Sequence, residues 1–432
     1  MTSKSSETDG LLNFASRIFP INRSLTGEGV RSTLKEIQTL CSSLKIRSVK
    51  SGTKVFDWRI PPEWHIQEAY ILDPNGLKFC DYSKNNLHLM GYSENIEKEV
   101  NLDELNKHLY SLPDQPLAIP YVTSYYHSDW GFCIAEADRC KLQKGIYKVV
   151  IKGKKFNGVM NYGEILVKGK SKKEIFLSTY ICHPSMANNE VSGITVLTFL
   201  AEYLLNIEKT YYTYRIVFIP ETIGSLYYIK KYGKKLKNRV IAGFNITCIG
   251  DERSYSFLPT RLGNTLSDKL AKHVLAYLDK NYIEYDWKDR GSDERQYCAP
   301  GINLPIASIM RSKYGEYPEY HTSLDKIGTV VTQAGLSGGL KALKLITEIL
   351  ESNFYPKANF IGEPQLSKYG LYPRISIKGD YSEARKCLDI LTWADGNHSV
   401  LEIADKSGYF APDLVDLILK MQHLRIIDLK RN

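Results

Sequence analysis

The chain has 432 residues, of which 43% are hydrophobic and 24% are charged, and its formal net charge is +9. This length suffices for two or three domains, each with its own core. The composition excludes an intrinsically disordered protein, and no run of about 18 apolar residues predicts a helix that crosses a membrane.

The net charge comes partly from lysine runs at 168–173 and 230–235. Such runs are usually solvated turns or helix ends, and a phosphorylated or nucleic-acid partner is the minority interpretation. The eight cysteines form no CxxC pair, and polar residues interrupt the first apolar segment, 11–21. We therefore expect reduced thiols, no signal peptide and a cytoplasmic protein.

Residues 10–44 predict one or two helices around the turn from Pro20 to Gly29. Arg23 and the two glycines of this turn can form a small loop that holds an anion. A turn that caps a helix is the commoner arrangement for such residues, so both interpretations stay open.

From residue 51 to about residue 152, short alternating runs between turn residues predict β-strands. Tyr125, Tyr126 and Trp130 lie in this segment, and such a density of aromatic side chains suits a groove for a polar organic ligand. The core of a small barrel or sandwich explains them equally well. Because strand and helix alternate again only near Gly163, we expect a β-rich domain inserted into, or preceding, an α/β unit.

The stretch from Glu174 to Gly193 predicts a buried strand (174–180), a Cys-His-Pro turn with His183, and an apolar helix (192–206). Three later apolar runs also stop on polar clusters, which would bring Glu221, Asp251 and His321 to the same edge of a parallel sheet. Two histidines with carboxylates suit a divalent metal such as zinc. The other helices expected here are 225–232, 265–280 and 332–351.

The pattern of apolar residues changes in the C-terminal part of the chain. Residues 356–373 carry Pro and Gly without periodicity and are expected to be a linker. Helices near 383–394, 400–406 and 411–424, followed by a strand at 426–429, are typical of a winged helix-turn-helix. From Lys378 onward there are 8 Lys and Arg against 9 Asp and Glu. This balance argues against a duplex DNA reader, which normally presents a basic face.

Seven stretches spread over almost the whole chain carry a family likeness. They are RSLTGEG (23–29), FDW (56–58), PYVTSYY (120–126), CHPS (182–185), PETIGS (220–225), GSDERQ (291–296) and EYHTS (319–323). With them the chain resembles bacterial aminopeptidase-like proteins, which are often encoded with polysaccharide-biosynthesis genes. The resemblance implies an α/β fold with a mainly parallel, zinc-aminopeptidase-like sheet, helices on both faces, an inserted small β-rich domain and a C-terminal winged helix.

The wider superfamily of zinc aminopeptidases and glutaminyl cyclases implies roles for single residues. Its first metal-binding histidine resembles His183, its last resembles His321, and its general base resembles Glu221. Simpler roles remain open: the histidines can be a hydrogen-bonded pair at strand ends, and Glu221 can cap the following helix. Asp325 is expected to orient its loop or the imidazole of His321.

Three anionic metal ligands of that superfamily fall on neutral residues here, at Asn189, Thr222 and Thr247. A two-zinc centre is therefore not expected. We expect at most one zinc, held by His183 and His321 with one acid. The leading candidates for that acid are Glu190 and Asp293.

Two functions stay open. The first is a zinc-dependent amide hydrolase that acts on a small aminoacyl or acylamino substrate, with Glu221 as the proton shuttle. The second is a non-catalytic amide- or sugar-binding protein with a degenerate metal site, and a transcription regulator is a weaker third. Tyr125, Tyr126, Trp130 and Arg295 are the candidate substrate contacts. We expect no membrane partner and no nucleic acid, and leave homo-oligomerisation open. The expected domains are 1–50 with 158–355, 51–157, and 374–432.

Overall fold

The computed structural model describes residues 3–372 and 382–431. These residues fall into two compact units: 3–268 with 281–341, and 269–280 with 342–372 and 382–431. Residue 374, where the winged-helix domain was expected to begin, lies outside the described residues. Within the described part of the chain, no helix is long and apolar enough to cross a membrane.

An eight-stranded sheet forms the centre of the first unit, in the order β1-β10-β12-β11-β13-β16-β14-β15. Strands β12, β11, β13 and β16 run parallel to one another. All residues of β11, β12 and β16 are buried, as expected for strands covered on both faces. The bounds are β1 Lys45–Lys50, β10 Val159–Val167, β11 Glu174–Tyr180, β12 Thr213–Ile219, β13 Val240–Ile246, β14 Ser256–Leu258, β15 Ile283–Glu284 and β16 Ile306–Met310.

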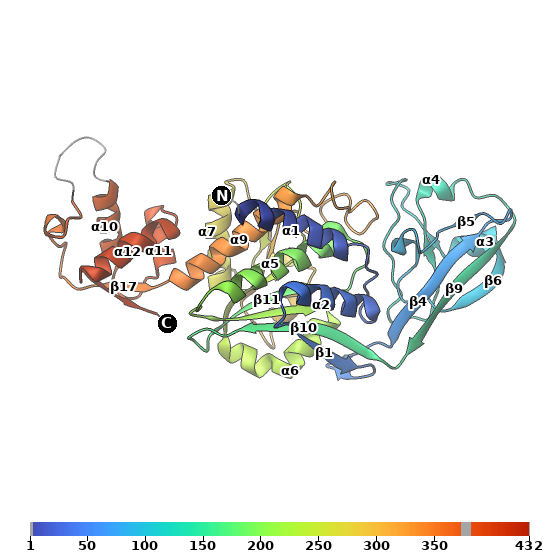
Figure 1. Cartoon of the computed structure of the whole chain (residues 1–432), viewed down its shortest axis with the longest axis horizontal. Helices are drawn as coiled ribbons and strands as arrows, with labels where there is room; N and C mark the ends of the chain where they lie inside the picture. The colour runs from blue at the N-terminus through green and yellow to red at the C-terminus, as the bar shows by residue number, and fades with distance from the viewer. Residues whose placement is uncertain (1–2, 373–381, 432) are drawn as a thin grey trace. The chain divides into compact units, whose positions relative to one another are not determined.

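Helices cover both faces of this sheet (Figure 1). Helices α1 (Ser3–Ile18), α2 (Glu28–Leu40) and α5 (Ser192–Asn206) lie on one face, and α6 (Ile223–Arg239) lies on the other. A π-helical turn, η2 (Ala187–Val191), leads into α5. Between residues 259 and 354 the chain forms α7 Leu266–Leu278, η3 Trp287–Asp289, α8 Glu294–Tyr297 and α9 Gln333–Ser352.

A second, antiparallel sheet lies between β1 and β10 in the sequence, in the order β5-β4-β9-β6. Its long strand β9 runs almost directly into β10 of the central sheet. The elements of this β-rich segment are β2 Lys54–Val55, β3 Trp58–Arg59, β4 Glu63–Leu72, β5 Lys78–Phe79, η1 Asn86–His88, β6 Ile96–Asn101, α3 Leu102–Lys107, β7 Leu109–Tyr110, β8 Phe132–Cys133, α4 Glu136–Arg139 and β9 Ile146–Phe156. The domain boundaries drawn from the sequence remain predictions.

The second unit contains the three expected helices, α10 (Ser382–Trp393), α11 (Val400–Ser407) and α12 (Pro412–His423). Ser399 begins α11 with a capping box to Glu402, and Gly408 ends it in the left-handed region, where glycine is favoured. Strand β18 (Ile427–Lys430) pairs with β17 (Tyr355–Ala358), and η4 (Leu366–Tyr369) follows β17. The linker prediction, 356–373, is therefore wrong for residues 356–358, because they belong to β17 of this two-stranded sheet.

The sequence-based predictions of β11 and α5 are confirmed at both ends. Helix α6 is longer than expected, since it begins at Ile223 and continues to Arg239 through the lysine-rich segment. The parallel strands β11, β12, β13 and β16 end at one edge of the sheet, where open α/β sheets bind ligands. The candidate site lies at this edge.

Candidate functional site

A pocket of about 590 Å³ opens at the carboxyl edge of the central sheet. It brings together residues from the ends of β11 and β12, from the loop before α9, and from the β-rich segment. Three chemically active side chains line it: His183, Glu221 and His321. The other lining residues are Leu25, Trp58, Tyr121, Thr123, Tyr125, Tyr126, Cys182, Thr222, Ile223, Arg295 and Gln296.

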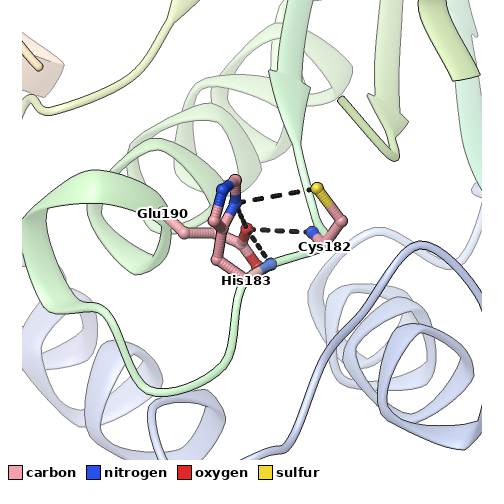
Figure 2. Close-up of side chains that lie close together, drawn as sticks. All are labelled: Cys182, His183 and Glu190. Carbon is pink, nitrogen blue, oxygen red and sulfur yellow. Dashed lines mark hydrogen bonds and ion pairs between the residues drawn. The ribbon is translucent and has the colours of Figure 1, made fainter. Parts of the chain in front are cut away.

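His183 is held by a buried carboxylate. Oε2 of Glu190 lies 2.8 Å from Nδ1 of His183 and accepts hydrogen bonds from the backbone N–H groups of Cys182 and His183 (Figure 2). The second oxygen, Oε1, lies 2.5 Å from Nε of Arg23, and both side chains are fully buried. Because Glu190 holds Nδ1 of His183, the other ring nitrogen, Nε2, faces Glu221.

Opposing effects set the charge of His183. Burial lowers its pKa, but the hydrogen bond to Glu190 and the negative charges of Glu190 and Glu221 outweigh burial, so the pKa is raised. Nε2 of His183 lies 3.8 Å from Oε2 of Glu221. A protonated imidazole can therefore face both this carboxylate and a bound ligand.

Glu221 occupies a strained turn at the end of β12. The carbonyl of Glu221 accepts a hydrogen bond from the N–H of Ile223 at 2.7 Å, and Thr222 between them has φ 61° and ψ −74°. This is a γ-turn with positive φ, which is rare and costly for a β-branched residue. Ser292 donates to Oε1 of Glu221 at 2.8 Å. Burial raises the pKa of Glu221, which makes its carboxylate a stronger base.

Residues 292–295 stabilise this turn through hydrogen bonds. Oδ1 of Asp293 accepts from the N–H of Thr222 and from the hydroxyl of Ser225, both at 2.8 Å. Nη2 of Arg295 donates to Oγ1 of Thr222 at 3.0 Å. Burial, followed by the charge of Glu221, raises the pKa of Asp293 to about 8. Asp293 thus lies behind the turn and supports Glu221, while Arg295 lines the pocket.

His321 has a neutral imidazole ring. Nδ2 of Asn189 lies 3.3 Å from Nε2 of His321. Because an amide nitrogen can only donate, Nε2 acts as the acceptor. Burial and the positive charge of His183 lower the pKa of His321 to about 3, so its ring is neutral at physiological pH. His321 itself has φ 56°, and its ring stacks on Tyr320 with centroids 3.8 Å apart.

The arrangement of the donor atoms decides whether these residues fit a zinc ion. Among residues 3–372 and 382–431, one group of three His, Cys, Asp or Glu has ligand atoms within 4.8 Å of one another: Cys182, His183 and Glu190. The Arg23 guanidinium already neutralises Glu190 there. The sulfur of Cys182 already accepts a hydrogen bond from the N–H of Glu221 at 3.2 Å. The donor set, as arranged, does not fit zinc.

The histidines and acids singled out from the sequence each have other hydrogen-bond or ring contacts. His183 and His321 lie close together, with ring centroids 5.5 Å apart. Glu190 is engaged by Arg23 and His183, and Asp293 by the turn at Thr222. Asp251 accepts from Asn188, Arg253 and Ser312, and Asp325 accepts from the backbone of Asn188 and Asn189 and from Tyr317.

Of the four candidate substrate contacts, Tyr125, Tyr126 and Arg295 line the pocket. Trp130 is not among the lining residues; its ring stacks on His108 within the β-rich segment. Sequence reasoning overlooked Tyr121, whose ring lies beside both His183 and His321, at centroid distances of 5.4 and 5.2 Å. The PYVTSYY stretch, which contains Tyr121, was the signal that could have identified it.

Comparisons with known proteins agree with this architecture. Residues 12–353 match a family model described as a domain of unknown function (DUF4910), and residues 354–428 match a winged helix-turn-helix model. A curated relative from Clostridium acetobutylicum is 42% identical over 94% of this chain and 93% of its own length. Its name describes a candidate polysaccharide biosynthesis protein with an aminopeptidase-like domain.

Solved structures extend the comparison. A candidate peptidase from Clostridium acetobutylicum is 37% identical, has a TM-score of 0.91 and covers 99% of this chain and 97% of its own. A zinc aminopeptidase from Bacillus subtilis has a TM-score of 0.54 at 13% identity, over 80% of this chain and 94% of its own. A peptidase M28 precursor from Shewanella amazonensis has a TM-score of 0.54 at 12% identity, over 84% and 99%. The last two share the fold, which confirms the aminopeptidase-like architecture.

Proposed function

This chain belongs to the family described as a domain of unknown function (DUF4910), and we propose that its pocket cleaves the amide bond of a small aminoacyl or acylamino compound. The observation that carries the proposal is Glu221, a partly buried carboxylate with a raised pKa that lies in the pocket 3.8 Å from Nε2 of His183. The aminopeptidase-like fold and the peptidase named among the relatives support a peptidase-like reaction.

The residues of the chain can carry the proton movements. Glu221 takes a proton from water, and the water oxygen attacks the carbonyl carbon of the amide. Protonated His183 donates from Nε2 to the carbonyl oxygen as negative charge develops there. The carbonyl re-forms as the C–N bond breaks, Glu221 returns its proton to the leaving nitrogen, and His183 keeps its own proton throughout. The resulting carboxylic acid and amine then exchange one proton, so the products are a carboxylate and an ammonium group.

The walls of the pocket suggest the substrate class. Its volume of about 590 Å³ suits a small molecule and excludes a folded polypeptide. Tyr121 and Tyr125, joined by a 2.6 Å contact between their hydroxyls, offer aromatic faces with polar tips. Arg295 offers a cation to an acidic substituent. A role in surface-polysaccharide biosynthesis rests on the name of the curated relative.

The family resemblance also raised the expectation that hydrolysis depends on zinc. Because the donor set does not fit zinc, the proton movements above use only side chains of the chain. In zinc aminopeptidases of this fold, a metal supplies the Lewis acid; here we assign the polarisation of the carbonyl to His183.

A second candidate function is non-catalytic binding of an amide or sugar. The hydroxyl of Tyr180 donates to Oδ1 of Asn189 at 2.8 Å and lies 2.5 Å from Oγ1 of Thr247, so this part of the site is uncharged. Through Asn189 this uncharged group contacts His321, whose neutral ring lines the pocket, and such surroundings favour recognition of an uncharged ligand over chemistry.

One experiment separates the two functions. Aminoacyl amides, dipeptides and N-acyl amino sugars are incubated with the wild type, with Glu221→Gln and with Glu99→Gln, an exposed carboxylate that serves as the matched control. The hydrolase proposal expects turnover that the Glu221 change lowers and the Glu99 change leaves intact. Saturable binding by calorimetry without turnover of any compound would instead establish the binding protein.

A further inference from the structure

The carboxylate behind His183 is paired with a permanent cation. Nε of Arg23 lies 2.5 Å from Oε1 of Glu190 and 3.0 Å from the carbonyl oxygen of His183, and Nη1 lies 2.6 Å from the carbonyl oxygen of Ile18. Arg23 and Glu190 are fully buried, so water screens neither charge. A metal ion bound at Glu190 would meet the guanidinium at close range and compete with it for the same oxygen.

The buried residues beside His321 are uncharged, and their polar atoms contact one another. The side chains of Tyr180, Asn189 and Thr247 are buried and contact one another, and Oγ1 of Thr247 also donates to the carbonyl of Asn189 at 3.0 Å. The amide of Asn189 uses the lone pair on Nε2 of His321. A metal ion would need that lone pair and anionic ligands, and Asn189, Thr222 and Thr247 supply no charge beside Glu221, the carboxylate that lines the pocket.

We infer that this site works without a bound divalent metal, with Arg23 as its built-in cation and with Asn189, Thr222 and Thr247 as the residues that keep a metal out. The Arg23–Glu190–His183 chain holds the imidazole in place, as the outer carboxylates of metal sites hold theirs. This inference goes beyond the proposed function, because neither ligand binding nor cleavage with Glu221 as the base decides whether a metal ion is bound.

The test measures metal directly. Wild-type protein, produced without a metal-affinity tag, is analysed for zinc and titrated with zinc in competition with a chelating dye. The expected result is far less than one zinc per chain and no saturable site. Near-stoichiometric zinc that His183→Ala and His321→Ala remove would overturn the inference.

Restoring charge tests which residues exclude the metal. Asn189→Asp alone changes the side-chain volume little, and it should create a saturable zinc site. Its dissociation constant should lie at least about 100-fold below the highest zinc concentration at which the wild type shows no binding, since even outer-shell changes alter metal affinity 10- to 100-fold. The triple variant Asn189→Asp, Thr222→Glu and Thr247→Asp should bind at least one zinc per chain. Its matched control makes the same three exchanges at the exposed positions Asn75, Thr39 and Thr329.

The outcomes are distinct. Zinc binding by the restored variants and not by the wild type or the control supports the inference. If both Asn189→Asp and the triple variant fold, as their thermal melts would show, and neither gains zinc, the three residues do not keep the metal out and the inference fails. None of these readouts depends on turnover, so failure of the hydrolase proposal leaves them interpretable.

Discussion

Nδ1 of His183 lies 2.8 Å from Oε2 of Glu190, and this contact decides which nitrogen of the imidazole faces the pocket. Glu190 can hold that position only because Arg23, which is 167 residues away in the sequence, neutralises its other oxygen. The RSLTGEG stretch near the N-terminus and the CHPS stretch after β11 therefore build one structure.

Glu190→Gln tests this pairing. The change leaves the guanidinium of Arg23 buried without its counter-charge, and breaking a buried ion pair in this way costs about 3–5 kcal/mol. Urea unfolding followed by circular dichroism measures the loss. Glu104→Gln, in an ion pair on the surface, should leave the midpoint unchanged. Equal midpoints for the two variants would show that the Arg23–Glu190 pair does not stabilise the fold.

Because the turn at Thr222 is strained, we expect a substitution that relieves the strain to raise stability and lower activity. Thr222→Gly removes the side chain that makes positive φ costly, and should stabilise the protein by about 1 kcal/mol after the flexibility of glycine is included. Activity should fall, because Glu221 is then held less firmly. Thr222→Ala is the control, since it loses the hydroxyl that accepts from Arg295 but keeps the strain. A stability gain in the alanine variant as large as in the glycine variant would rule out strain as the cause.

Asp293 predicts a pH dependence of stability. Its pKa is raised from 3.8 to about 8, so the folded state keeps a proton that the unfolded state releases. The contribution of Asp293 is therefore fully present below about pH 4 and is lost as the pH rises through about 8. Asp293→Asn should flatten the fall in unfolding free energy over this range, and the surface change Asp103→Asn should not. An unaltered slope in the Asp293 variant would contradict the assignment.

The winged helix should not read duplex DNA. In helix-turn-helix proteins, the start of the recognition helix contacts the bases. Here residues of α7 in the same unit engage the start of α12: Nε2 of His273 accepts from the N–H of Ala411 at 2.9 Å, and Tyr277 stacks on Phe410 with centroids 3.6 Å apart. Mobility-shift titration with random duplexes at physiological salt should show nothing tighter than the non-specific range, roughly 10⁻⁶ M. Tight, sequence-dependent binding would restore the regulator hypothesis.

Much of the fold was readable from local patterns. Strand β11 and helix α5 have the predicted bounds because a continuous apolar run and a helical spacing of apolar residues each leave little choice of structure. The gathering of His183, Glu221 and His321 followed from the rule that parallel strands end at one edge. Strand β17 was missed because only its pairing with β18 makes it a strand.

The contacts inside the site could not be read in the same way. Nothing near Glu190 in the sequence indicates that Arg23 would neutralise it, and nothing near Tyr180 indicates that its hydroxyl would lie between Asn189 and Thr247. These contacts join residues brought together only by the complete sheet. Positive φ at Thr222 was equally hidden, because a β-branched residue is the wrong choice for such a turn by local preference.

The most direct test of the account is the pH profile of kcat/KM on the compound of the panel that is cleaved fastest, measured for wild type and Glu221→Gln before and after extensive chelation. We predict that wild-type cleavage rises with pH through a pKa above 4.5, the ordinary value for Glu221. It should survive chelation and fall by roughly 10²- to 10⁴-fold in the Gln variant. A Gln variant as fast as the wild type would contradict Glu221 as the base, and cleavage that disappears on chelation and returns with zinc would contradict a site that works without a metal.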